Sequence, residues 1–61
     1  MNFNEKVLYV RALLGLTQSE LAKELNVSFA TINRWENDKV KPSKKMEYIF
    51  KIFCKNKNVK F

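Results

Sequence analysis

Between positions 30 and 37 the sequence places side chains whose types could read the edges of base pairs. An Asn amide can pair bidentately with adenine, and an Arg guanidinium can pair bidentately with guanine. Asn33 and Arg34 would share one helix face with Ala30 and Asn37, because residues three and four apart are neighbours on a helix surface. The small Ala30 would allow close approach to a groove, and Asn37 could reach a phosphate. This face predicts a helix in the major groove of double-stranded DNA, although Asn33 and Arg34 alone also fit an ordinary solvated surface.

Phe29 begins the same segment and extends the candidate surface. An apolar side chain there could contact the methyl group of thymine. A Phe exposed at the start of a helix favours a binding role, because large apolar groups on a surface usually mark a contact. The ring could equally tuck against the preceding helix, and the sequence leaves both alternatives open.

Three further helices must position this face, and the first follows from apolar spacing. Its apolar residues recur at intervals of four, three and four, which is typical of one helix face. Asn2, with Glu5 three residues on, forms a candidate N-terminal cap. Gly15 ends the helix, because Gly readily adopts the left-handed conformation needed there. The residues of this face are Phe3, Val7, Val10 and Leu14.

A second, short helix precedes the candidate reading helix. Thr17-Gln18-Ser19-Glu20 is a capping box, in which Thr17 accepts from the backbone N–H of Glu20 and Glu20 reaches back. Asn26 suits a left-handed turn, and Ser28 can cap the next helix. The turn of about three residues between the two helices is the spacing of a helix-turn-helix. Their inner faces consist of Leu21, Ala22, Leu25, Ile32 and Trp35.

A last helix follows a break in the helical pattern. The residue before Pro42 disfavours α geometry, and Ser43 can then cap a helix. The remaining tail is polar apart from Val59 and Phe61, so we expect it to be frayed or loosely docked. The apolar side of the last helix consists of Met46, Ile49, Phe50 and Phe53.

Composition agrees with a small helical domain. The chain of 61 residues is 46% hydrophobic and 13% aromatic, as in globular proteins. One Gly and one Pro leave few turns, which favours a few helices over many strands. We predict a single all-α domain over residues 1–61, a compact bundle of four helices, or five, with a helix-turn-helix unit at about 17–37.

The net charge of +6 is distributed unevenly along the chain. Residues 1–33 carry equal numbers of acidic and basic side chains, whereas residues 34–61 carry nine Lys or Arg against three Asp or Glu. A one-sided basic surface attracts polyanions, nucleic acid first and an acidic membrane or protein second. Solubility alone is the alternative interpretation.

Other classes of function find little support. A single Cys54 and no His exclude an internal disulfide, provide too few ligands for structural zinc and favour a reducing compartment, the cytoplasm. No apolar run approaches the roughly 20 residues of a membrane span, and no targeting segment is recognisable. Glu20 and Glu24 share a helix face, but catalytic carboxylates need a pocket, and so short a helical chain should offer little concavity. We expect no enzyme, no metal, no cofactor and no small-molecule ligand.

A helical wheel also places two opposite charges on inner shoulders. Arg11 lies there on the first helix and Glu36 on the third. Half-buried charges normally need partners, so we predict an Arg11–Glu36 ion pair with a structural role.

This pattern resembles the Cro/C1-repressor type of helix-turn-helix, also called the Xre family. The resemblance is close over residues 11–42 and looser in the flanking helices. It implies a lambda-repressor-like all-α domain that binds operator DNA, commonly as a dimer on paired half-sites. The matching positions are Arg11, Gly15, Leu16, Thr17, Gln18, Glu20, Leu21, Ala22, Leu25, Val27, Ser28, Ile32, Trp35, Glu36, Asn37 and Pro42.

The resemblance also implies which residues meet DNA, and it includes the Arg11–Glu36 pair as a recurring feature. The N-terminus of the helix that begins at Gln18 would add backbone N–H groups and a favourable dipole for phosphate. The positions that would read base edges are Ser28, Phe29, Ala30, Asn33 and Arg34. The positions that would contact the DNA backbone are Thr17, Gln18, Asn37, Lys39 and Lys41.

Three departures from the family pattern bear on function. Asp38 stands where the family usually has Gly and puts a negative charge near the expected DNA path, and Asn26 replaces a turn Gly. The fifth helix that often supports dimerisation is not evident, so a monomer and a homodimer both stay open.

We therefore predict a sequence-specific DNA-binding transcriptional regulator, a small repressor or controller that acts on the nucleoid. A protein-interaction module, such as an antitoxin or anti-repressor, is the alternative, and Phe29 and Asp38 would fit it. An enzyme ranks third.

Overall fold

Local capping interactions set the bounds of the helices in a computed structural model that describes all 61 residues. The Thr17 hydroxyl accepts from the Glu20 N–H at 3.0 Å, and Glu20 accepts from the Thr17 N–H at 2.8 Å, so the predicted capping box is confirmed. Ser28 and Ser43 cap the two following helices, and each side chain accepts from the backbone N–H three residues on. The chain forms four helices and no strand: α1 (Phe3–Leu14), α2 (Gln18–Leu25), α3 (Phe29–Glu36) and α4 (Lys44–Asn56).

The ends of the first two helices also follow from residue type. Gly15 ends α1 with φ 67°, and Asn26 ends α2 with φ 58°. Both are left-handed conformations, which Gly adopts freely and Asn tolerates better than most residues. The turns that lead into α2 and α3 are therefore the ones that the sequence predicts.

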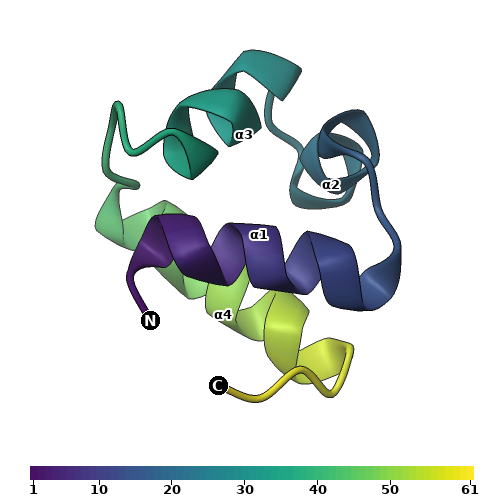
Figure 1. The fold of residues 1–61 in the computed structure, drawn as a ribbon. Helices are drawn as coiled ribbons and strands as arrows, with labels where there is room; N and C mark the ends of the chain where they lie inside the picture. The colour runs from purple at the N-terminus through teal and green to yellow at the C-terminus, as the bar shows by residue number, and fades with distance from the viewer.

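The other helices are arranged around α1 (Figure 1). In this view α2 and α3 lie above α1, whereas the C-terminal half of α4 and the C-terminus lie below it. Helix α3 contacts both α1 and α2, and α4 also packs against α2. The predicted all-α bundle is confirmed, and it has four helices, the first of the two numbers that the sequence allows.

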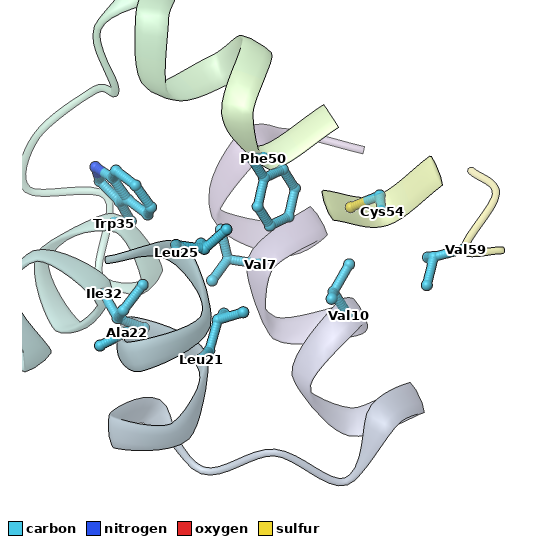
Figure 2. Packing of buried hydrophobic residues seen from close by; sticks show 10 residues of the cluster. All are labelled: Val7, Val10, Leu21, Ala22, Leu25, Ile32, Trp35, Phe50, Cys54 and Val59. Carbon is cyan, nitrogen blue, oxygen red and sulfur yellow. The ribbon is translucent and has the colours of Figure 1, made fainter. Parts of the chain in front are cut away.

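One core joins all four helices, and Figure 2 shows its side chains converging. Trp35 lies edge-on to Phe3, with ring centroids 5.2 Å apart, and Phe3 lies edge-on to Phe50 at the same distance. Such edge-to-face pairs add to the free energy gained by burial alone. The buried apolar residues are Val7, Val10, Leu21, Ala22, Leu25, Ile32, Trp35, Phe50, Cys54 and Val59.

The C-terminal tail departs from our expectation of a frayed or loosely docked end. Val59 is buried in the core, and its N–H donates to the Cys54 carbonyl at 2.8 Å. Asn58 makes this return possible with φ 59°. Phe61 then lies against Tyr9, with ring centroids 5.7 Å apart. Burying one large apolar side chain in a small domain gains enough free energy to hold the preceding turn in place.

No helix of the structure combines the length and the apolar character that crossing a membrane requires.

Candidate nucleic-acid interface

The outward face of α3 is the centre of the candidate interface. Ile32 and Trp35 are buried beneath it, which turns the opposite side of the helix toward solvent. Ala30, Arg34 and Asn37 are exposed there, and Asn33 is half-buried. Helical register places these four side chains along one face, so the orientation predicted by the helical wheel is confirmed.

Phe29 projects into solvent at the start of this face. Its side chain is 52% exposed, so of the two alternatives left open by the sequence, the exposed one holds. Ser28 lies beside it, and its hydroxyl accepts from the Thr31 N–H at 3.2 Å and lies 2.9 Å from the Thr31 hydroxyl. The Ser28 side chain therefore already caps α3 and would have to keep or exchange these hydrogen bonds on meeting a base.

The predicted ion pair between Arg11 and Glu36 is present and ties α1 to α3. Arg11 Nη2 donates to Glu36 Oε1 at 3.0 Å, and Arg11 Nε donates to Oε2. Arg11 Nη1 also donates to the Leu16 carbonyl at 3.0 Å, which fixes the turn before α2. Hydrogen bonding to Glu36 is the main reason that the pKa of Arg11 is raised above its usual value. The guanidinium therefore stays charged while the Glu36 side chain is only 6% exposed.

A row of amide side chains continues from this ion pair to the outward face of α3. Gln18 Nε2 donates to Glu36 Oε1 at 2.7 Å, and Asn33 Nδ2 lies 3.4 Å from Gln18 Oε1. Asn37 Nδ2 in turn donates to the Asn33 carbonyl at 2.9 Å and to Asn33 Oδ1 at 3.2 Å. The row links the first residue of α2 to both Asn residues of the candidate reading helix.

Sequence reasoning predicted the residues of this row but missed the links between them. Gln18 was expected to contact the DNA backbone, and the structure also gives its amide a role in orienting Asn33. The Asn33–Asn37 hydrogen bond could have been found from their spacing of four residues. The Gln18–Glu36 bond has no local signal, because 18 positions separate the two residues.

The turn after α3 explains why the family pattern has Gly at position 38. Asp38 adopts φ 56°, a left-handed conformation that Gly takes most readily and that Asp tolerates. Its carboxylate lies 3.8 Å from Lys41 Nζ, with both side chains largely exposed. A pair so exposed contributes little stability. The positive charge of Lys41 nevertheless offsets part of the negative charge of Asp38, and both Lys39 and Lys41 are exposed.

At the opposite edge, the N-terminus of α2 lies beside the same face of α3 through the Gln18–Asn33 contact. Thr17 is exposed there, and its hydroxyl oxygen already accepts the capping hydrogen bond from Glu20. The structure thus brings Thr17, Gln18 and the α3 face together, with the loop of Lys39 and Lys41 at the other end of α3.

The expectation of little concavity is wrong. A groove with a volume of about 860 Å³ lies among α1, α4 and the C-terminal tail. It is absent from the face of α3, and neither Glu20 nor Glu24 lines it. Glu20 is engaged in the capping box, and Glu24 lies 3.8 Å from Lys57. The two carboxylates that sequence reasoning weighed for catalysis are therefore placed in other contacts.

Comparisons with known proteins agree with this geometry. A model of the helix-turn-helix family matches residues 7–46, which include all of α2 and α3. The HTH-type transcriptional activator BcrR of Enterococcus faecalis is 44% identical over 43 residues, which are 70% of this chain and 21% of that protein. The chain thus corresponds to about a fifth of the length of that relative. No solved structure matches the chain. On the strength of the family match and the α2–turn–α3 geometry, the chain belongs to the Cro/C1-type helix-turn-helix family of DNA-binding regulators.

Proposed function

We propose that residues 1–61 form one domain that binds a specific sequence of double-stranded DNA and regulates transcription as a small repressor or controller on the cytoplasmic nucleoid. Helix α3 enters the major groove, and the observation that carries this proposal is its outward face of Ala30, Asn33, Arg34 and Asn37 above the buried Ile32 and Trp35. That face combines a small residue for close approach with the amide and guanidinium groups that pair with adenine and guanine.

The proposed base-reading residues differ in how firmly they are held. Asn33 is oriented by Gln18, which is anchored in turn to the ion pair. Because a side chain held before binding loses less conformational entropy, Asn33 suits a fixed contact with one base. The Arg34 side chain makes no hydrogen bond or ion pair within the chain and can extend to a guanine or a phosphate. Ser28, Phe29 and Ala30 would meet the bases nearest the N-terminus of α3.

The DNA backbone would be held at both ends of α3. At one end the N–H groups at the start of α2 can donate to a phosphate, since the first turn of a helix has free donors and a favourable dipole. Thr17 and Gln18 lie at this point. At the other end, Asn37 would contact a phosphate and Lys39 and Lys41 would extend along the backbone. These contacts fix position, whereas the α3 face reads sequence.

The decisive experiment selects bound duplexes from a random pool and measures affinity for the selected site at several salt concentrations. A conserved short motif and a log–log salt slope of about −2 for each bound chain, as expected from Lys39 and Lys41, would support the proposal. Arg34→Ala should lose about 1–3 kcal/mol of binding free energy and relax one position of the motif. Lys55→Ala is the control, because it removes one positive charge from α4 and should leave the motif unchanged. No enrichment at low salt would refute DNA reading.

The same selection tests assembly. A monomer on one site and a homodimer on two half-sites, which the family resemblance implies, are the two alternatives. Two motifs about one helical turn apart would support a homodimer, and a single motif would indicate a monomer. A transcriptional reporter then gives the sign of regulation. Lowered expression would support a repressor, whereas raised expression would overturn that part of the proposal and leave DNA binding intact.

A protein-interaction module on the same scaffold is the second candidate, and the 52% exposure of Phe29 is the observation that favours it. An antitoxin or anti-repressor would use this ring and Asp38 against a protein partner. In that case the unmodified chain would capture a co-purifying protein and would not bind duplex DNA. Phe29→Ala would then abolish capture of that protein. A shared loss of DNA affinity would instead assign Phe29 to the DNA interface.

A further inference from the structure

The groove among α1, α4 and the C-terminal tail has an apolar floor. Its floor consists of the buried Phe50, Cys54 and Val59, and its accessible apolar surface comes from the half-buried Phe3 and the exposed rings of Tyr48 and Phe61. Phe61 forms one wall, 55% exposed and held by Tyr9 and by Lys6, whose Nζ lies 5.3 Å above the ring centroid. A concave apolar surface that is already formed in the free chain is the usual form of a binding site.

Four lysines and one acidic residue line this groove. Lys6 comes from α1, Lys51 and Lys55 come from successive turns of α4, and Lys60 comes from the tail, whereas Glu47 is the single acidic residue that lines the groove. Lys6 acts on the floor itself, because its charge partly opposes the rise in the pKa of Cys54 that burial causes. The groove therefore offers apolar contact at its centre and cations at its rim.

This surface is separate from the proposed DNA interface. The groove is lined by residues of α1, α4 and the C-terminal tail, and none of the outward residues of α3 lines it. A duplex seated on α3 would leave it free. A substantial part of the basic excess of residues 34–61, including Lys51, Lys55 and Lys60, thus serves a face that the proposed DNA contact does not use.

We propose that the groove binds an acidic, amphipathic segment of a partner protein. Leucine-like side chains at helical spacing would lie against the half-buried Phe3 and the exposed rings of Tyr48 and Phe61, and flanking Glu or Asp residues would meet the lysines. Lys51 and Lys55 are one turn apart, so carboxylates one turn apart on a partner helix would match them. This is the binding of an amphipathic helix in an apolar groove, with charge setting the choice of partner.

Charge complementarity favours this occupant over the others. A second copy placed face to face would bring the lysines of both rims together, and like charges in an interface oppose association. Duplex DNA carries its charge on a convex surface and has no apolar projection that would fill the floor. An acidic amphipathic helix satisfies both the floor and the rim.

The test uses three synthetic peptides of about 14 residues with ¹⁵N-labelled full-length chain. The first has Leu at helical spacing and Glu at the intervening positions; the second replaces every Glu with Lys; the third has the composition of the first with its Leu residues dispersed around the helix. We expect only the first to produce saturable amide shifts, centred on Lys51, Lys55 and Val59. Equal binding of the dispersed peptide would overturn the proposal, because it would mean that net charge alone drives association.

Charge reversal on the groove provides the matched comparison. Lys51→Glu/Lys55→Glu should weaken binding of the first peptide by about tenfold or more, whereas Lys44→Glu/Lys45→Glu, with the same change of charge at the other end of α4, should weaken it less than about threefold. Lys51→Gln/Lys55→Gln repeats the test without added negative charge, should the first variant unfold. Equal losses in the two pairs of variants would refute a site at the groove.

The alternative occupants are outcomes of the same experiment. Shifts at the groove that grow with protein concentration in the absence of peptide would assign it to a second copy. Shifts there with vesicles of anionic phospholipid but not with peptide would assign it to a membrane surface, and shifts there with a DNA duplex would assign it to nucleic acid. Each of these results would overturn the proposal that the groove binds an acidic segment of a partner protein.

Discussion

Replacing Arg11 with Met should destabilise the domain severely, because the substitution leaves Glu36 charged and nearly buried. Glu36 would lose both hydrogen bonds from Arg11 and keep only the one from Gln18. The Leu16 carbonyl would lose its donor as well. Breaking a buried ion pair costs about 3–5 kcal/mol, and the 22% exposure of Arg11 favours the lower end of that range. A chain of this size has a total stability of about 3–9 kcal/mol, so a loss of about 3 kcal/mol would remove a third of it or more.

Thermal and urea unfolding followed by circular dichroism would measure this loss in a double-mutant cycle. At about 4–8 °C per kcal/mol for a small domain, Arg11→Met should lower Tm by roughly 12–24 °C. The double variant Arg11→Met/Glu36→Met should be more stable than Arg11→Met, because no buried charge is left without its partner. We expect a coupling free energy of about 2 kcal/mol or more.

Lys57→Met is the matched control for this cycle. Lys57 lies 3.8 Å from Glu24 with both side chains about half-exposed, so its loss should change stability by less than about 1 kcal/mol. The reasoning fails if Arg11→Met and Lys57→Met shift Tm equally. It also fails if the two single changes at the buried pair are additive, since additivity would mean that Arg11 and Glu36 do not depend on each other.

Three further predictions concern the turn after α3, the core thiol and the tail. Asp38→Asn keeps a residue that tolerates φ 56° and removes a negative charge. Duplex affinity at low salt should therefore rise several-fold in a titration, with little change in Tm. Asp38→Gly should add up to about 1 kcal/mol to the free energy of unfolding. An unchanged affinity for Asp38→Asn would place this carboxylate away from the DNA, and a lower affinity would refute repulsion between the carboxylate and phosphate. Burial raises the pKa of Cys54, so the thiol should react with a disulfide reagent at pH 8 far more slowly in the folded chain than in urea; equal rates would show that it is accessible. Val59→Ala should lose about 1–2 kcal/mol in urea unfolding, whereas a frayed tail would make the change silent.

Much of the fold could be predicted from the sequence, because its signals are local. The capping box at Thr17 and the left-handed residues Gly15 and Asn26 depend on contacts within about one helical turn, so residue type and spacing are sufficient to recognise them. The outward face of α3 follows from the same periodicity once Ile32 and Trp35 are assigned to the core.

The ion pair shows how far this kind of reasoning extends. Arg11 and Glu36 are 25 positions apart, yet their pairing was predictable because each lies on the inner shoulder of its own helix and needs an opposite charge. The amide of Gln18 carries no such requirement, since it can be satisfied by water. Its bond to Glu36 and its contact with Asn33 depend on the distance and angle at which α2 meets α3.

The sequence by itself therefore determined where each helix begins and ends, which face of α3 meets solvent and that two opposite charges pair. The tertiary structure decided that Val59 enters the core, that Gln18 links the ion pair to Asn33, and that α1 and α4 leave a groove rimmed with lysines. The physical reason is the separation along the chain between the residues that interact. Caps and periodicity are interactions between near neighbours, whereas a docked tail, a hydrogen bond across 18 positions and a groove exist only once the helices have packed at particular angles.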